Sequence, residues 1–246
     1  MQGITIRILT VFGIFGTISS GVATAQNIKD VWQTGLRDAS FTAVVTTGNQ
    51  RELAKINKDF ANSYRFKSST VKLKEPMKLR LESKVEDQNI LFIVNGVNRL
   101  VRVPQSNINI RENLAKSPGK RQTLLDFGMI TPSLFNDFFT AKFIRNDRAT
   151  GDLVFDMNYV PRLDDSTRHR VWIDPQKRYV TKREWYSQID GRLLATFLYE
   201  NPKSDGGVWF PTRVTVKNAD NKVAGITDYK GLSINGGIDD SLFKVN

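Results

Sequence analysis

The chain has 246 residues, a net charge of +11 and no cysteine. The missing cysteine excludes disulfides, thiolate metal sites, a cysteine nucleophile and an acylated N-terminal cysteine. The cations are scattered along the chain, which is more typical of a solvated surface than of a nucleic-acid site, so we expect no nucleic-acid partner.

Residues 1–25 resemble a secretory signal peptide. Arg7 precedes an apolar run at residues 8–18, and Ala23-Thr24-Ala25 gives an A-x-A cleavage pattern. A transmembrane anchor is the alternative, but spanning a bilayer takes about 20 apolar residues and this run is shorter. We therefore expect cleavage and a mature domain over 26–246. Its charge would be +10, because Arg7 is the only charged residue removed from a total of +11. Absence of cysteine fits export to a bacterial periplasm.

Helical and strand patterns alternate at the start of this domain. Asn27 is placed to cap a first helix, and Asn49 with Glu52 resembles the capping box of a second. Residues 40–47 between them are strand-like. The apolar stripes of the two helices are Ile28, Val31, Trp32 and Leu36, and then Leu53, Ile56 and Phe60.

In residues 70–82, TVKLKEPMKLRLE, every odd position except Glu75 is apolar, and the cations all fall on even positions. This period of two predicts a strand pair with one buried face and one face in water. Residues 90–103 then predict a hairpin, with Asn95-Gly96 in a type I′ turn. Further short strands follow to the end of the chain. We expect about nine to eleven strands, within errors of roughly 2–4 residues at each boundary.

One interruption separates the strands. Residues 116–122 form a loop, and Thr131-Pro132 has the sequence of a helix start. Leu134, Phe135, Phe138 and Phe139 would share one face of that helix. A sheet this long must curl to protect its apolar face. The fold predicted is a mainly β single domain: a curled antiparallel half-barrel with two or three short helices covering its concave face.

Signals for catalysis or metal binding are weak. His169 is the only histidine and has no neighbouring catalytic motif, so a structural role is favoured over a hydrolase. Asp164-Asp165 and Asp239-Asp240 lack the alternating oxygens of a calcium loop and are interpreted as turn residues. Residues 177–186 mix cations and aromatics as single-strand nucleic-acid sites do, but a strand near an edge, wetted on both sides, explains them equally well. We predict a protein that is not an enzyme, with no cofactor and no metal.

The remaining signal is apolar surface. The helix and concave sheet either pack together as an ordinary core or enclose a cavity sized for a lipid chain, because wide β-barrels can hold ligands. Periodicity does not distinguish a filled interior from an empty one.

The order of short motifs along residues 27–245 resembles the bacterial periplasmic carriers that sort lipoproteins to the outer membrane, the LolA-like superfamily. The motifs are Lys74-Glu75-Pro76 followed by Arg80, ILFIVNG running to Pro104, VWIDP at residues 171–175, Asp190-Gly191, Phe210-Pro211, and INGGIDDSLFKV at residues 234–245.

This resemblance implies a hydrophobic cavity that shields lipid or lipoprotein acyl chains in transit. It also implies transient contacts with membrane-bound donor or acceptor proteins and, we expect, a monomer. The alternative is an envelope-stress sensor that uses the same half-barrel. Strand parity and the helical stripe then give a set of ligand-binding candidates: Val71, Leu73, Met77, Leu79, Leu81, Phe92, Leu134, Phe135, Phe138, Phe139, Trp172 and Phe197.

Glu75 departs from the family pattern. The well-studied carriers have an arginine before this proline, and that arginine takes part in closing the lid. We expect Glu75 at the rim of the cavity or the lid, either paired with a cation or protonated when buried.

Overall fold

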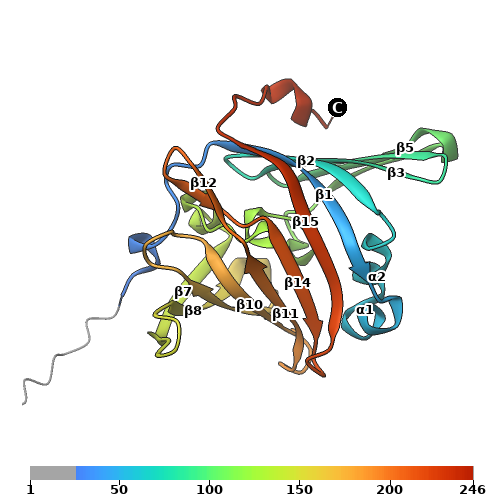
Figure 1. The fold of residues 1–246 in the computed structure, drawn as a ribbon. Coiled ribbons are helices and arrows are strands. Elements are labelled where there is room, and N and C mark those ends of the chain that lie inside the picture. Colours follow the sequence, from blue (N-terminus) through green and yellow to red (C-terminus); the bar gives the residue numbers. More distant parts are fainter. Residues whose placement is uncertain (1–25, 246) are drawn as a thin grey trace, which may run out of the picture.

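The computed structural model describes residues 26–245, so the expected signal peptide lies outside the described residues. One sheet of thirteen antiparallel strands dominates the fold, and a separate two-stranded hairpin, β12–β13, stands beside it (Figure 1). The strands are β1 Asp38–Gly48, β2 Ser68–Lys74, β3 Lys78–Val85, β4 Gln88–Asn95, β5 Asn98–Val103, β6 Ile108–Asn113, β7 Phe139–Asn146, β8 Leu153–Tyr159, β9 Arg168–Ile173, β10 Val180–Tyr186, β11 Leu193–Glu200, β12 Lys203–Asp205, β13 Val208–Phe210, β14 Arg213–Asn218 and β15 Val223–Ile234.

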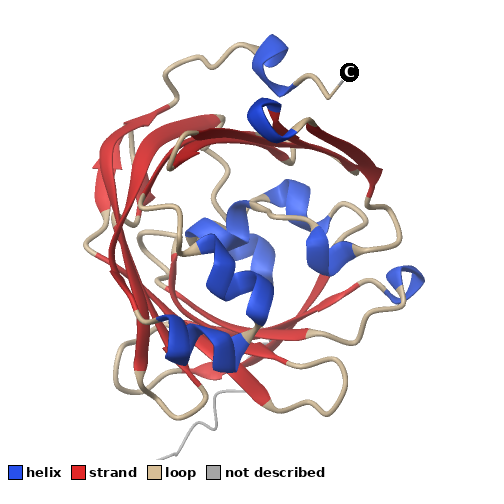
Figure 2. Ribbon diagram, turned by 90° about the vertical axis from the view of Figure 1, so that its right-hand side faces the viewer, coloured by secondary structure: helices blue, strands red, loops and turns tan. Residues whose placement is uncertain are grey.

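The first and last strands meet in the middle of the large sheet. Its order is β6-β5-β4-β3-β2-β1-β15-β14-β11-β10-β9-β8-β7, so β6 and β7 are its two edges. The connection from β6 to β7 is residues 114–138, which we call the plug. Because the sheet curls, the chain passes from one edge to the other through the hollow, and Figure 2 shows helical segments inside the ring of strands.

The curled antiparallel sheet was predicted correctly, but the predicted nine to eleven strands are too few. Residues 26–245 form fifteen strands and two α-helices, α1 Gln50–Ile56 and α2 Lys58–Ser63. The other helical segments are 3₁₀ turns: η1 Ile28–Asp30, η2 Pro104–Ser106, η3 Pro118–Lys120, η4 Leu124–Phe127, η5 Pro132–Phe135, η6 Pro161–Leu163 and η7 Asp240–Phe243. Within residues 26–245, no helix has both the length and the apolar character needed to cross a membrane.

The predicted helices are all shorter than expected, for local reasons. The first is reduced to η1. The second divides at Asn57, whose extended backbone ends α1 and whose side chain accepts hydrogen bonds from the first N–H groups of α2. The third begins at Pro132 after Thr131, as predicted, but it ends at Phe135, and Phe139 starts β7.

The hairpin of β4 and β5 forms as predicted, with its turn shifted by one residue. Asn95 pairs with Asn98, so the two loop residues are Gly96 and Val97 rather than Asn95 and Gly96. Gly96 has φ +59° and Val97 is not among the residues with positive φ. Glycine at the first loop position is the pattern of a type II′ turn instead of type I′.

The apolar odd positions of residues 70–82 lie on one buried face, as predicted. Val71, Leu73 and Leu79 are 1%, 1% and 2% exposed and lie in the main core. The curl therefore turns the odd positions of β2 and β3 inward and the cations outward.

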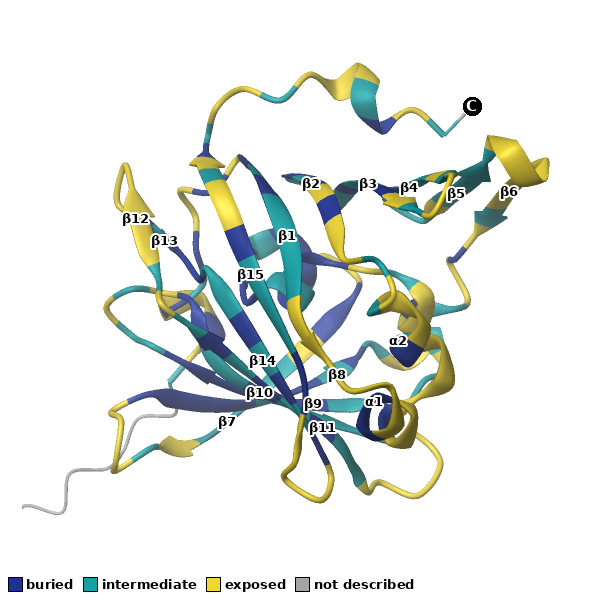
Figure 3. Ribbon diagram, turned by 45° about the vertical axis from the view of Figure 1, so that its right-hand side comes forward, coloured by how far each residue is buried: buried dark blue, intermediate teal, exposed yellow. Residues whose placement is uncertain are grey.

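The sequence suggested that the cations of residues 70–82 face water, but several of them contact the C-terminal segment of the chain. Residues 235–245, which we call the strap, run over the outer face of β2–β5 (Figure 3). Lys74 Nζ donates to Ile238 O at 2.6 Å and Arg80 NH1 donates to Leu242 O at 2.9 Å. Lys78 Nζ pairs with Asp240 Oδ1 at 2.8 Å. Asp240 is thus an ion-pair partner rather than an ordinary turn residue.

An apolar contact completes the attachment of the strap. Phe243 is fully buried against Ile93 and Leu100, which form a second small core on the outer face of the sheet. The basic positions of β2 and β3 therefore hold the C-terminal strap of the same chain.

Candidate functional site

Most of the predicted ligand-binding side chains lie together on the inner side of the sheet. Those in the main core are Val71, Leu73, Met77, Leu79, Leu134, Phe138, Phe139 and Phe197, and Leu81, Phe92 and Phe135 are partly buried against it. Leu134, Phe135 and Phe138 belong to the plug; we call the other members of this set, with the sheet side chains around them, the interior surface.

Trp172 is not part of the interior surface. Val171 and Ile173 belong to the main core, so Trp172 lies on the opposite face of β9. There its Nε1 donates to Asp147 Oδ2 at 3.0 Å, and Lys182 Nζ lies 3.6 Å from the centre of its ring. Trp172 is 5% exposed because long polar side chains cover it, and not because it faces the hollow.

The plug fills the interior in this conformation. Its apolar side chains Leu124, Leu125, Met129, Ile130 and Leu134 are at most 2% exposed. The two best-defined pockets in residues 26–245 are not lined by the predicted cavity residues. Of the two alternatives that the sequence left open, this conformation has the filled interior, and the cavity implied by the family resemblance is not open in it.

The plug backbone lies very close to the sheet at Gly128. Gly128 has φ +81°, and a Cβ at this position would lie 2.7 Å from Tyr199 Cδ1. The Gly128 carbonyl accepts a hydrogen bond from Val180 N at 2.8 Å, and the Tyr199 hydroxyl donates to Leu125 O at 3.1 Å. Only glycine allows the plug to lie this near to the sheet.

Glu75 lies at the contact between the sheet and the plug. Its Oε1 accepts a hydrogen bond from the Thr131 hydroxyl at 2.9 Å, and Ser133 lies beside Thr131. Burial raises the pKa of Glu75 above its ordinary value, and the hydroxyls of Ser133 and Thr131 offset part of this effect. In the described structure the partners of Glu75 are hydroxyl groups, and no ion pair to this carboxylate is formed.

A buried cation that sequence reasoning did not place lies on the interior surface. Arg183 of β10 has a side chain only 6% exposed, and its NH1 pairs with Asp126 Oδ1 of the plug at 2.9 Å. Strand β10 lies between β9 and β11, so residues 177–186 are not near an edge as the sequence suggested. The mixture of cations and aromatics in this strand did not indicate that Arg183 is buried.

His169 faces the same interior. It is 6% exposed and stands edge-on to Phe139, with ring centres 5.9 Å apart. Burial, together with the charge of Arg183, lowers the pKa of His169 well below its ordinary value. A neutral imidazole among aromatic rings is the structural role favoured from the sequence.

A cleft opens through the wall of the sheet beside β15. Pairing of β14 with β15 ends at Asp228, and the next hydrogen bond, from Tyr229 N to Thr212 O, is 2.8 Å long. From Lys230 to Ile234, β15 pairs only with β1. The cleft lies between this segment and β12, with a volume of about 480 Å³.

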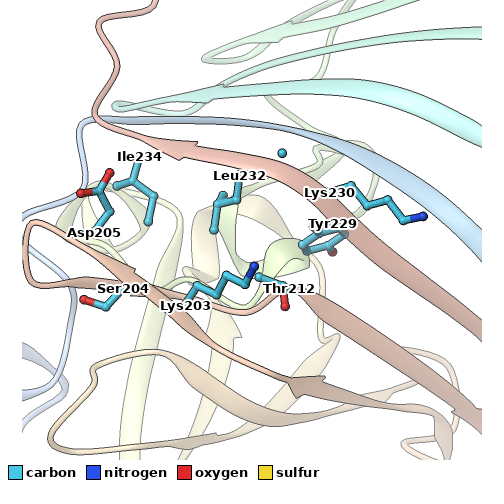
Figure 4. A pocket seen from close by; sticks show the side chains of 9 residues that line it. Lys203, Ser204, Asp205, Thr212, Tyr229, Lys230, Leu232 and Ile234 are labelled. Carbon is cyan, nitrogen blue, oxygen red and sulfur yellow. The ribbon is translucent and has the colours of Figure 1, made fainter.

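The lining of the cleft is amphipathic. Lys203 and Asp205 of β12 face Tyr229, Leu232 and Ile234 of β15 (Figure 4). Tyr229 stacks on Phe41 with ring centres 4.3 Å apart. Phe41 also packs edge-on against Phe127 of the plug, with ring centres 5.7 Å apart. The floor of the cleft is therefore continuous with the aromatic interior.

Metal ligation has no visible basis in the described residues, since no three His, Asp or Glu side chains there are grouped to hold an ion. Asp239 caps η7 by accepting from Ser241 N, as its turn interpretation predicts.

Comparison with known proteins shows the fold. A family model described as an uncharacterized protein matches residues 129–246. A search of curated proteins finds no match. Solved structures similar to this chain include a LolA superfamily protein from Nitrosomonas europaea, at 16% identity and TM-score 0.55, covering 88% of this chain and 94% of that one.

Two further structures agree with the first. A domain described as an outer membrane lipoprotein-sorting protein, from Vibrio parahaemolyticus, has 13% identity and TM-score 0.54, covering 88% of this chain and 93% of that one. A DUF1329 family protein from Desulfovibrio piger has 12% identity and TM-score 0.51, with coverage of 88% and 92%. The chain has the LolA-like fold, as its resemblance predicted.

Proposed function

We propose that this protein is a periplasmic carrier that binds lipid or lipoprotein acyl chains on the interior surface and shields them from water on the way to the outer membrane. It acts without catalysis or a cofactor. Its other partners are membrane-bound donor and acceptor proteins, which it contacts transiently as a monomer, and it does not bind nucleic acid.

The observation that carries this proposal is the way the interior surface is covered. The plug forms no strand pairing with the sheet within residues 26–245. Its main-chain contacts to the rest are isolated bonds, such as Gln33 N to Ile130 O at 2.7 Å and Val180 N to Gly128 O at 2.8 Å. A segment held mainly by side-chain burial can leave without breaking the sheet, and acyl chains can replace its apolar side chains.

The cleft gives the acyl chains a route. Its apolar floor is formed by the partly buried Leu232 and the buried Ile234 and Tyr229, and Tyr229 stacks on the aromatic rings inside. Ligand sites are commonly clefts of about 300–1,000 Å³ lined by apolar groups and a few polar ones. At about 480 Å³ the cleft is large enough to admit the end of a hydrocarbon chain.

The energetics suit reversible binding. Burial of methylene groups gives about 0.8 kcal/mol each, so a chain of sixteen carbons gains on the order of 10 kcal/mol gross. Displacing the plug offsets part of this gain, because Leu124, Leu125 and their neighbours lose their own burial. A carrier needs this balance to release its cargo.

Identification of co-purifying molecules tests the cargo. The protein would be expressed with its export signal, purified without detergent and analysed by native mass spectrometry and lipid extraction. Bound phospholipid or lipoprotein supports the carrier. A stoichiometric protein partner without lipid would favour the envelope-stress sensor.

A reversible crosslink tests the role of the plug. Cysteines at Glu75 and Thr131, whose side chains are in hydrogen-bond contact, would be joined by a reducible methanethiosulfonate bridge, and the natural chain has no cysteine to interfere. We expect the crosslinked protein to lose binding of a fluorescent fatty acid and the same sample to regain it after reduction. Equal binding in both states would show that ligand uptake does not need plug movement.

A further inference from the structure

Arg183 is unusual among the cations of this chain because it points into the apolar interior. Its guanidinium lies 4.2 Å from the centre of the Phe197 ring, and its strand neighbours are Val171 and Phe197. A charge in such a place is costly unless it is paired. The other arginines of this half of the sheet, such as Arg170 with Asp156, pair on the outer face.

The hydrogen-bonding capacity around Arg183 is not used up. Its Nε is buried and has no hydrogen-bond partner in residues 26–245. On the neighbouring strand β9, His169 Nδ1 is likewise buried without a partner. A guanidinium has five N–H donors in a planar fork that fits a carboxylate or phosphate.

The counter-ion of Arg183 belongs to the movable part of the structure. Asp126 lies in η4 of the plug, and its Oδ2 also accepts a hydrogen bond from Thr123 N at 2.9 Å. Departure of the plug therefore removes the carboxylate and leaves Arg183 unpaired on an apolar surface. Asp126 is partly exposed but Arg183 is buried, and leaving a buried charge without its partner is strongly unfavourable.

We infer that Asp126 occupies the position of an anionic group of the ligand, and that Arg183 selects acyl-chain ligands with a carboxylate or phosphate head over neutral ones. The ligand anion takes the place of Asp126 as the plug moves out, so Arg183 stays paired throughout. This inference rests on the proposed function and specifies the chemical class of its ligand.

A competing interpretation is that the Arg183–Asp126 pair only fastens the plug. The two differ in selectivity. A fastener affects charged and neutral ligands equally, whereas an exchange site affects their ratio.

The test measures the affinities of the wild-type protein for oleate and for monoolein, which share one acyl chain and differ in head charge. Oleoyl lysophosphatidate is measured beside them to separate a phosphate head from a carboxylate head. We expect at least one of the two anionic ligands to bind tenfold or more tightly than monoolein. Acetate and inorganic phosphate are the controls for an anion without a chain, and we expect neither to compete.

Three variants and one control locate the selectivity. We expect Arg183→Met to bring the ratio of anionic to neutral affinity close to one, while monoolein binding is kept or improved. Asp126→Asn, which removes the competing carboxylate, should raise anionic affinity more than neutral affinity. Arg183→Lys keeps the charge and should retain part of the preference. Arg170→Met is the matched control, because it removes an Arg–Asp pair on the outer face of the same half of the sheet.

Several results would overturn the inference. Equal affinities of the wild-type protein for oleate, oleoyl lysophosphatidate and monoolein would do so without any variant. So would an unchanged ratio in Arg183→Met, or competition by acetate at the concentrations at which oleate binds. Absence of binding of every acyl ligand would instead contradict the proposed function itself.

Discussion

Phe243 provides the sharpest test of how the strap is attached. This side chain is fully buried against Ile93 and Leu100 on the outer face of the sheet. If the strap stayed in place, the cavity left by Phe243→Ala would cost about 3–5 kcal/mol. At about 2–4 °C for each kcal/mol in a chain of this size, Tm would fall by roughly 6–20 °C.

The strap is a chain end, however, and it can detach while the sheet stays folded. The loss of stability is then limited to the free energy with which the strap docks. We therefore expect Phe243→Ala to lower Tm by less than the full range, and to abolish hydrogen-exchange protection of the strap amides, including Leu242 and Lys244. Lys244→Ala is the control, because Lys244 is exposed in the same segment. A large Tm loss with strap protection intact would refute this reasoning.

Three other substitutions test the plug and the strap. Glu75→Gln keeps the acceptor for Thr131 but removes the charge. Because burial raises the folded-state pKa of Glu75, the wild-type protein should lose stability relative to the variant as pH rises above about 4. The loss should be about 1.4 kcal/mol for each pH unit between the unfolded and folded pKa values. Urea titrations at several pH values measure this difference, and a difference independent of pH would contradict it. Gly128→Ala places a Cβ 2.7 Å from Tyr199 and should lower the free energy of unfolding by about 1–3 kcal/mol. Gly151→Ala is the control for the backbone cost alone, because Gly151 has φ +79° and open space around it. Equal losses of stability in the two variants would exclude a steric role for Tyr199. Asn235→Ala removes the acceptor for Arg37 N at 2.7 Å and the donor to Gly35 O at 2.9 Å. We expect it to lower the free energy of unfolding by about 1–3 kcal/mol. If Asn235→Gly were as stable as the wild type in thermal denaturation, only the backbone conformation of residue 235, with φ +57°, would matter.

The sheet was predictable from the sequence because its signal is local. Residues 70–82 alternate cleanly, and the register of β2 with β3 pairs Val71 with Leu81 and Leu73 with Leu79, which turns the apolar side chains to one face. The strand number was underestimated where local signals were weak. The segment at Phe138 and Phe139 was assigned to a helix because its aromatic spacing also fits a helical face.

The plug could not be predicted in the same way. Gly128 ends η4 and Pro132 begins η5, so these 3₁₀ turns are short and no apolar period extends over more than a few residues. Their position in the hollow follows from the order of the strands, in which β6 and β7 lie at opposite edges. That order is a property of the whole chain and is not encoded in any single segment.

The polar features of the interior were also beyond the sequence. Arg183 and Asp126 are 57 positions apart, and nothing local distinguishes Arg183 from the exposed cations beside it. Lys74 and Arg80 each donate a hydrogen bond to a main-chain carbonyl of the strap, and such acceptors have no sequence signature. Long-range polar contacts of this kind appear only when the fold is known.

The pairing of β1 with β15 has a consequence for the order of folding. Ala39 lies opposite Ile234, so the centre of the sheet joins residues from the two ends of the domain. Until β15 has been synthesised, one side of β1 has no neighbour, and the two halves of the sheet have no common strand pair. Since contacts between distant residues slow folding, the chain stays extended for longer after synthesis begins. For the periplasmic location that we propose, this delay would let the chain pass a narrow translocation channel before its last strand locks the first in place.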